Sequence, residues 1–98
     1  MKLGIFVLNP NQLSAILGLT TAALEAGDSV RFFINDHGTK LLAEPSFTAL
    51  ADRVAMSFCE YSAKKLGVDL SNLPKAIKKG TQLNNAIMYQ SCEKVIVL

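Results

Sequence analysis

The sequence contains few of the residues that metal centres and disulfide frameworks require. It has one histidine, two cysteines and no tryptophan among its 98 residues. Cys59 and Cys92 lie far apart and form no C-x-x-C pair, so we expect neither a disulfide framework nor a zinc site. In a reducing compartment each cysteine is either an inert buried thiol or a reactive one. We therefore expect no bound metal.

The glycine-rich motifs that bind nucleotide phosphates are also missing. The first apolar segment is followed by NPNQLS, which is neither G-x-G-x-x-G nor G-x-x-x-x-G-K-[ST]. The chain has no G-x-S-x-G elbow. Asn9, Asn11 and Cys59 stand where a receiver domain carries its acidic cluster and phosphoacceptor aspartate. We therefore expect no nucleotide site and no cofactor.

The charge and the apolar content limit the kinds of partner. Ten basic and eight acidic residues give a net charge of +2, which is too small and too scattered to indicate nucleic-acid binding. No apolar run approaches the ~18 residues that cross a bilayer, and no signal-peptide cleavage site follows the first apolar run. We expect a cytoplasmic protein that does not enter a membrane. Half of the residues are apolar, which is high for so small a core and predicts subunit contacts.

Short apolar segments alternate with helical patterns along the whole chain. Strands are predicted over residues 3–8, 30–34, 53–58, 76–79 and 94–98. Helices are predicted over residues 12–26, 39–43, 46–51, 59–66 and 82–89. Nearly continuous apolar strands are typical of parallel sheets that are covered on both faces. The pattern predicts one α/β domain over residues 1–98, a three-layer α/β/α sandwich on a mostly parallel sheet of four to five strands.

Apolar spacing and polar caps predict how the helices lie. In the first long helix the core-facing stripe is expected to be Leu13, Ile16, Leu17, Thr20 and Leu24, with Gly27 as the left-handed stop. Ser46 is the expected cap of the helix at 46–51. Thr81 is the expected cap of the last helix, whose buried stripe would be Leu83, Ala86 and Ile87. The segment 94–98 is expected to be a buried strand.

Cys59 stands where the third long apolar strand passes into a helix. Ligands gather at the carboxyl ends of strands in parallel sheets. Ser57 and Glu60 fit the S-x-x-E capping box, which would place Cys59 in the first helical turn. Free N–H groups and the positive end of the helix dipole favour a thiolate there, whereas the neighbouring Glu60 opposes it. The alternative, a small buried cysteine that packs the strand end, stays open on the residues alone.

The polar loops after the first two strands, Asn9–Asn11 and Asn35–Gly38, are expected to form the mouth of a site around Cys59. The candidate residues in these loops are Asn9, Asn11, Asp36 and His37. Histidine titrates near neutral pH, so His37 could act as a proton donor to Cys59, although an exposed turn position before a glycine is favoured. Cys92 falls at the opposite edge of a parallel sheet and is expected to be structural.

The ordered features resemble the DsrE-like family of small sulfur-carrier proteins, which includes DsrE, DsrF and the TusD type. The resemblance covers nearly the whole chain. It depends on LGIFVL followed by a helix that leads into ALEAGDSVRFFINDHG, on SFCEYSAKKLGVD, and on the closing KKGTQLNNAIMYQSCEKVIVL.

The resemblance implies a DsrEFH-like α/β/α fold, an activity and partners. Such proteins assemble as dimers, trimers or hexamers, some from paralogous subunits. In active members a cysteine after the third main strand carries a persulfide, and Cys59 stands at that position. They accept sulfur from a TusA-type donor protein and pass it to a DsrC-like acceptor. The expected function is therefore that of a small sulfurtransferase or sulfur carrier that uses no cofactor.

Two other functions remain open at this point. A non-catalytic oligomeric subunit of the same fold would bind a partner or a small ligand, and its Cys59 would react slowly with alkylating reagents. A redox sensor would form a transient mixed disulfide through Cys59 and would respond to peroxide.

Overall fold

The five strands form one parallel sheet at the centre of the molecule. The computed structural model describes all residues from Met1 to Leu98. The strands are β1 (Lys2–Val7), β2 (Ser29–Ile34), β3 (Ala55–Cys59), β4 (Ile77–Gly80) and β5 (Lys94–Val97). They lie in the order β4-β3-β2-β1-β5, and every neighbouring pair is parallel. The predicted α/β architecture is confirmed.

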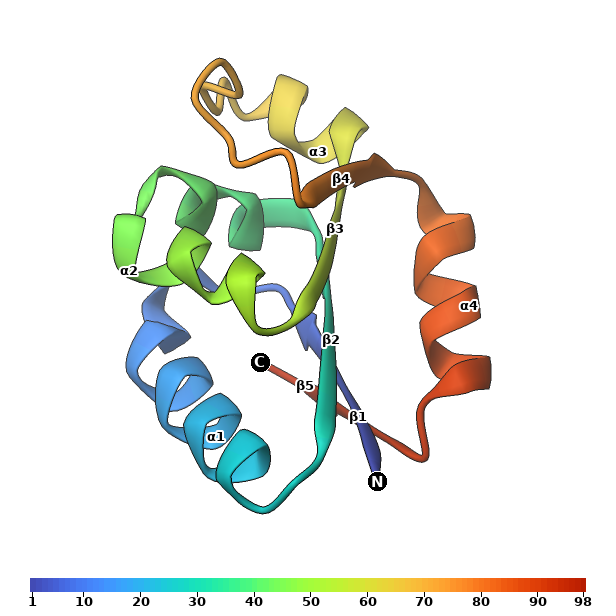
Figure 1. Cartoon of the computed structure of the whole chain (residues 1–98). Coiled ribbons are helices and arrows are strands. Elements are labelled where there is room, and N and C mark those ends of the chain that lie inside the picture. Colours follow the sequence, from blue (N-terminus) through green and yellow to red (C-terminus); the bar gives the residue numbers. More distant parts are fainter.

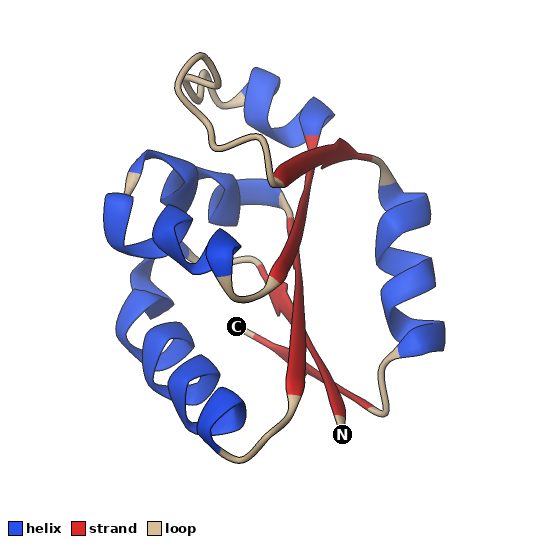
Figure 2. Cartoon of the chain, viewed as in Figure 1, coloured by secondary structure: helices blue, strands red, loops and turns tan.

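The helices cover the two faces of this sheet unequally (Figures 1 and 2). One face carries α1 (Leu13–Glu25), α2 (Pro45–Thr48) and the 3₁₀ segments η1 (Pro10–Gln12), η2 (Asp36–Ala43) and η3 (Ala49–Asp52). The other face carries α4 (Gln82–Ser91) alone, and α3 (Glu60–Lys65) lies beyond the carboxyl end of β3. None of these helices is long and apolar enough to span a membrane.

The larger hydrophobic core lies on the face that α1 covers. Alternate side chains of the strands enter it, among them the fully buried Ile5, Phe32 and Phe58. Phe32 stacks on Phe47 of α2 with 5.6 Å between the ring centroids. Because β1 and β2 are interior strands with helices over both faces, their sequences are mostly apolar, and the polar residues Lys2, Ser29 and Arg31 are exposed.

Helix α1 presents the predicted stripe to this core. Ile16 and Thr20 are fully buried, and Ala23 is buried beside them. The three leucines of the predicted stripe pack at the margin of the core and are half-buried. Gly27 follows the helix with a φ of 87°, the left-handed conformation expected of a glycine that ends a helix.

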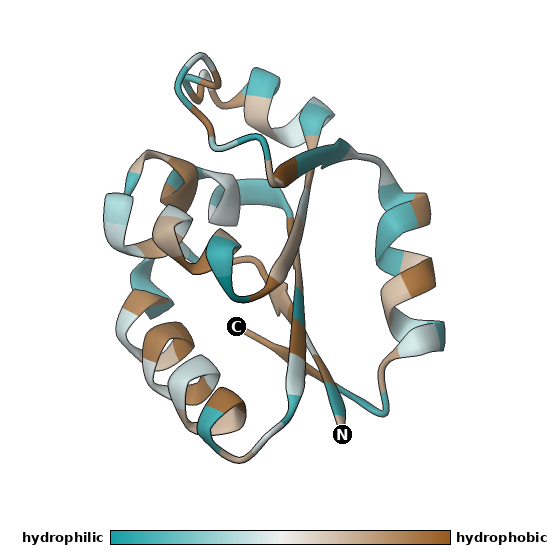
Figure 3. Cartoon of the chain, viewed as in Figure 1, coloured by the Kyte–Doolittle hydropathy of each residue, from teal (hydrophilic) through white to brown (hydrophobic).

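The predicted buried stripe of α4 is wrong. Thr81 caps the helix in a capping box with Asn84, as expected, but Met88 is the buried residue. Leu83 is 66% exposed and Ile87 is 42% exposed. Figure 3 shows hydrophobic residues in brown on α4 as well as on the strands. The packing at Gly4 explains the difference, because a Cβ there would lie 3.0 Å from Met88 Cγ. Because Gly4 has no side chain, Met88 can pack against the sheet at this position. This contact fixes which side of α4 faces inward.

Two smaller predictions are also corrected. The segment 94–98 is not a buried strand, because β5 is the edge strand next to β1 and Val97 is 54% exposed. Ser46 is not a helix cap, because α2 already begins at Pro45 and its N-cap residue is Glu44. Proline suits the first helical position, where no N–H group is needed.

Gly38 is expected to be indispensable for the approach of η2 to the end of β1. A Cβ at Gly38 would overlap the backbone carbonyl of Val7, which cannot move without disturbing the sheet. Gly38→Ala should therefore lower the free energy of unfolding by ~1–3 kcal/mol in a urea titration. Gly18→Ala is the matched control, because a Cβ there meets nothing within 4 Å. That helical change should raise stability by ~0.5–1 kcal/mol, and an equal effect of both substitutions would contradict the packing.

Candidate functional site

A cavity of about 620 Å³ opens at the carboxyl edge of the sheet. It lies where β2, β3 and β4 end and where α3 and α4 begin. Its volume falls within the ~300–1,000 Å³ typical of small-molecule sites. The residues around it are mostly polar: Leu8, Asn35, Asp36, Cys59, Glu60, Tyr61, Ser62, Lys64, Gly80, Thr81 and Gln82.

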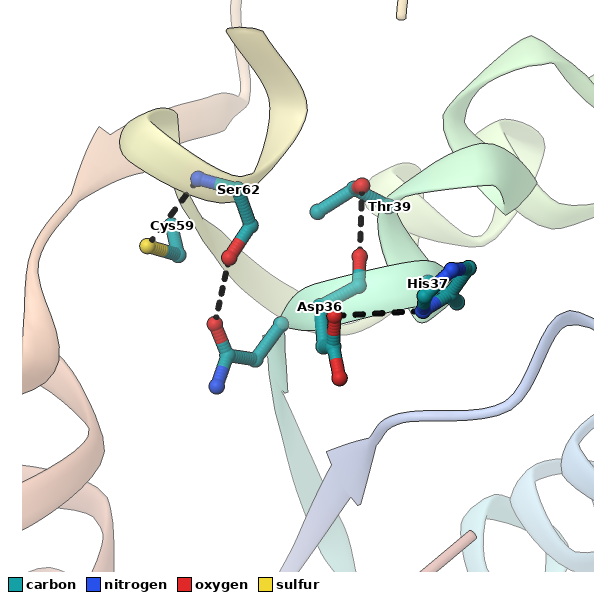
Figure 4. Close-up of polar contacts among 6 residues, drawn as sticks. Asp36, His37, Thr39, Cys59 and Ser62 are labelled. Carbon is teal, nitrogen blue, oxygen red and sulfur yellow. Dashed lines mark hydrogen bonds and ion pairs between the residues drawn. The ribbon is translucent and has the colours of Figure 1, made fainter. Parts of the chain in front are cut away.

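Cys59 is at once the last residue of β3 and the N-cap of α3. The Ser62 backbone N–H donates a hydrogen bond to Cys59 Sγ at 3.5 Å (Figure 4). The predicted capping by Ser57 is therefore wrong. Ser57 is still inside the strand, opposite Lys78, and the pairing with β4 continues to Cys59 opposite Gly80. This extra strand residue makes the thiol, rather than a hydroxyl, the group that caps the helix.

The Cys59 side chain lies between an apolar cluster and the cavity. Phe33 and Met88 pack with it in the smaller core beneath α4, and the residue is only 7% exposed. Cys59 is also one of the residues that line the cavity.

Asn35 connects the end of β2 to the first turn of α3. Its side-chain Oδ1 accepts a 2.9 Å hydrogen bond from Ser62 Oγ (Figure 4). Its backbone N–H donates to the Val7 carbonyl, and its carbonyl accepts from the Gly38 N–H. The sequence placed Asn35 in a mouth loop but gave no sign of this contact, because its partner lies 27 residues away.

Glu60 is neutralised by lysines from two elements. Its Oε2 lies 3.4 Å from Lys79 Nζ of β4 and 3.5 Å from Lys64 Nζ of α3. The hydrogen bond from Lys79 and the charge of Lys64 lower the pKa of the Glu60 carboxyl below its ordinary value of 4.5. This pairing stabilises the fold at pH values above the unfolded pKa and is lost as pH falls through the folded one. Glu60 therefore offsets part of the positive charge that these two lysines bring.

The other predicted site residues are only partly gathered around Cys59. Asp36 lines the cavity, and its carboxylate lies 3.2 Å from Nδ1 of the exposed His37. Asn9 caps η1 by accepting the Asn11 N–H at 2.9 Å, and neither asparagine lines the cavity. No three His, Cys, Asp or Glu side chains cluster as they would around a metal ion.

Cys92 lies at the opposite edge of the sheet from Cys59. It follows α4 and borders a separate, smaller hollow beside Lys2 and Ser29, at the amino ends of β1 and β2. Its half-buried sulfur packs near Gly4. This position agrees with the opposite-edge placement expected from the sequence.

Replacement of Glu60 should make Cys59 more reactive. Glu60→Gln removes a carboxylate that disfavours a neighbouring thiolate and releases two lysines. The alkylation rate of Cys59 should rise by roughly twofold to fivefold between about pH 5 and pH 8, measured by mass spectrometry of the cysteine peptide. Asp69→Asn is the control, since that carboxylate is bound by Ser71 away from the cavity. An unchanged or slower rate for Glu60→Gln would contradict this electrostatic assignment.

Comparison with known proteins identifies the fold. No family model and no curated protein sequence matches the chain. The crystal structure of the YchN protein from E. coli matches with a TM-score of 0.82 at 16% identity, over 100% of this chain and 99% of that one. MTH1491 from Methanobacterium thermoautotrophicum, titled a protein of unknown function, matches with a TM-score of 0.67 at 12% identity, over 99% and 96% of the two chains. The chain therefore shares one α/β fold with both.

Proposed function

We propose that this protein is a small sulfur carrier that holds sulfane sulfur as a persulfide on Cys59. One observation carries the proposal: the Cys59 sulfur caps α3 and borders a 620 Å³ cavity at the carboxyl edge of the sheet. The resemblance to DsrE-like proteins places a persulfide-bearing cysteine at the same position in the sequence. The observed α/β fold is the one that this resemblance implies.

The transfer needs only thiol exchange. The Cys59 thiolate attacks the outer sulfur of a donor persulfide, and the bond between the two donor sulfurs breaks. The donor leaves as a thiolate that takes the electron pair and accepts the proton lost by Cys59. An acceptor thiolate then attacks the outer sulfur on Cys59. The bond between this sulfur and Cys59 Sγ breaks, and Cys59 is released as a thiolate. Each step exchanges one sulfur–sulfur bond for another, so no external oxidant or cofactor is required.

The proposed donors and acceptors are proteins that present a thiol or persulfide. Tyr61 is 72% exposed at the edge of the cavity and offers an aromatic contact for such a partner. Self-association, or association with paralogous subunits, is part of the same proposal. It is supported by α4, which contains no charged residue and exposes Leu83, Ile87 and Tyr89.

The second candidate is a non-catalytic module that binds a small ligand in the cavity. Its support is the low exposure of Cys59 together with a cavity of ligand size. The module would need no sulfur chemistry, so removal of the thiol would leave its function unchanged.

Cys59→Ser should abolish sulfur loading and leave the fold intact. After incubation with a protein persulfide or polysulfide donor, mass spectrometry should find one added sulfur atom on Cys59 of the wild-type chain and none on the variant. Cys92→Ser is the control and should load normally, because Cys92 lies at the other edge of the sheet. Loading of the Cys59→Ser chain to the wild-type level would refute the assignment.

A further inference from the structure

We propose that Asn35 and Ser62 are positioning residues that hold the first turn of α3 against the Cys59 sulfur. The inference deepens the proposed sulfur-carrier function and rests on it for its biological meaning. The pair would set how readily Cys59 forms a thiolate, although neither side chain is expected to react.

The hydrogen-bond donor to the Cys59 sulfur is the backbone N–H of Ser62. Ser62 is the third residue of α3, and its backbone N–H points to Cys59 Sγ at 3.5 Å. A thiolate gains more from such a donor than a neutral thiol does, so the contact favours the ionised form. The benefit depends on distance and direction, and both are set by the position of the helical turn.

Contacts with the rest of the fold hold this first turn of α3 in place. Helix α3 has six residues, buries Ala63 in the main core and packs against η2. Two polar contacts join it to the ends of neighbouring strands. One is the exposed ion pair between Glu60 and Lys79, and the other is the 2.9 Å hydrogen bond from Ser62 Oγ to Asn35 Oδ1. The second contact involves the residue whose N–H faces the sulfur.

Two backbone hydrogen bonds hold Asn35 in place. Its backbone N–H bonds to the Val7 carbonyl at 2.9 Å, and the Gly38 N–H bonds to its carbonyl at 3.0 Å. The end of β1 and the start of η2 thus fix the Asn35 backbone on both sides. Its side chain transmits this fixed position to Ser62 and, through the Ser62 amide, to Cys59.

The charged groups around Cys59 would not account for the expected effect. Glu60 and Lys64 lie on α3, Lys79 lies on β4, and Asp36 lies on η2, while α4 carries no charge. Neither Asn35 nor Ser62 is titratable, and truncating either side chain leaves every one of these charges in place. A change in the pH profile of Cys59 would therefore report on the position of the N–H donor.

The test follows the alkylation rate of Cys59 against pH in Asn35→Ala, Ser62→Ala and the double variant. Peptide mass spectrometry separates Cys59 from Cys92, which serves as the reference thiol within each chain. We expect the midpoint of the Cys59 profile to move up by about 0.2–0.7 pH units in each single variant, the range of a helix-end interaction. The double variant should move no further than the singles, because all three lose the same hydrogen bond.

Conservative and unrelated substitutions provide the controls. Ser62→Thr keeps a hydroxyl at the same place and should restore the wild-type midpoint. Ser14→Ala, at an exposed position of α1, should leave it unchanged. If Asn35→Ala fails to fold, Ser62→Ala decides the question, since it keeps the backbone N–H and removes only the hydroxyl.

The outcomes separate this inference from the proposed function. Midpoints of Asn35→Ala and Ser62→Ala that coincide with the wild type would overturn the positioning role, even if the wild-type chain loads sulfur. Shifted midpoints that Ser62→Thr restores would support it, even if the wild-type chain fails to load sulfur and the carrier function falls.

Discussion

The pairing of β3 between two parallel neighbours determines the candidate site. Phe58 lies opposite Ile34 of β2 and Lys79 of β4, and the ladder with β4 continues for one more residue, to Cys59 opposite Gly80. Because the strands are parallel, their carboxyl ends meet at one edge and bring together residues that are distant in sequence. The extra residue of pairing delays the start of α3, so the cysteine becomes the helix cap.

The unequal helix layers explain why Cys59 is buried and yet borders the cavity. The face under α1 has a core of 17 buried residues, whereas the cluster of fully packed residues under α4 is limited to Phe33, Cys59 and Met88. With only one helix over that face, the space between the starts of α3 and α4 remains open and forms the cavity. The Cys59 side chain therefore lies at the boundary between this apolar cluster and the cavity. There the Ser62 backbone N–H donates its hydrogen bond to the sulfur.

Local patterns in the sequence were sufficient to predict the architecture and the corner that carries Cys59. Runs such as LGIFVL and KVIVL are nearly continuous in apolar residues, and glycines such as Gly27 mark the ends of helices. The alternation of strands and helices can therefore be recognised from the local sequence. The side of α4 that faces the sheet could not be predicted from local sequence, because it depends on the packing of Met88 against Gly4, 84 positions earlier in the chain. Likewise, the S-x-x-E pattern at Ser57 indicated a cap, but pairing with β4 kept that serine in the strand. Asn35 was placed in the mouth loop, yet its bond to Ser62 exists only in the folded chain.

To carry sulfur, Cys59 must react from the native state although so little of its surface is exposed. The decisive measurement compares the alkylation rate of Cys59 at pH 7 in the folded chain with its rate in the urea-unfolded chain. We predict that the folded chain reacts at least as fast, because the cavity gives access and the Ser62 N–H favours the thiolate. A Cys59 that reacts about a hundredfold more slowly when folded, as expected of a thiol enclosed by Phe33 and Met88, would contradict the central claim.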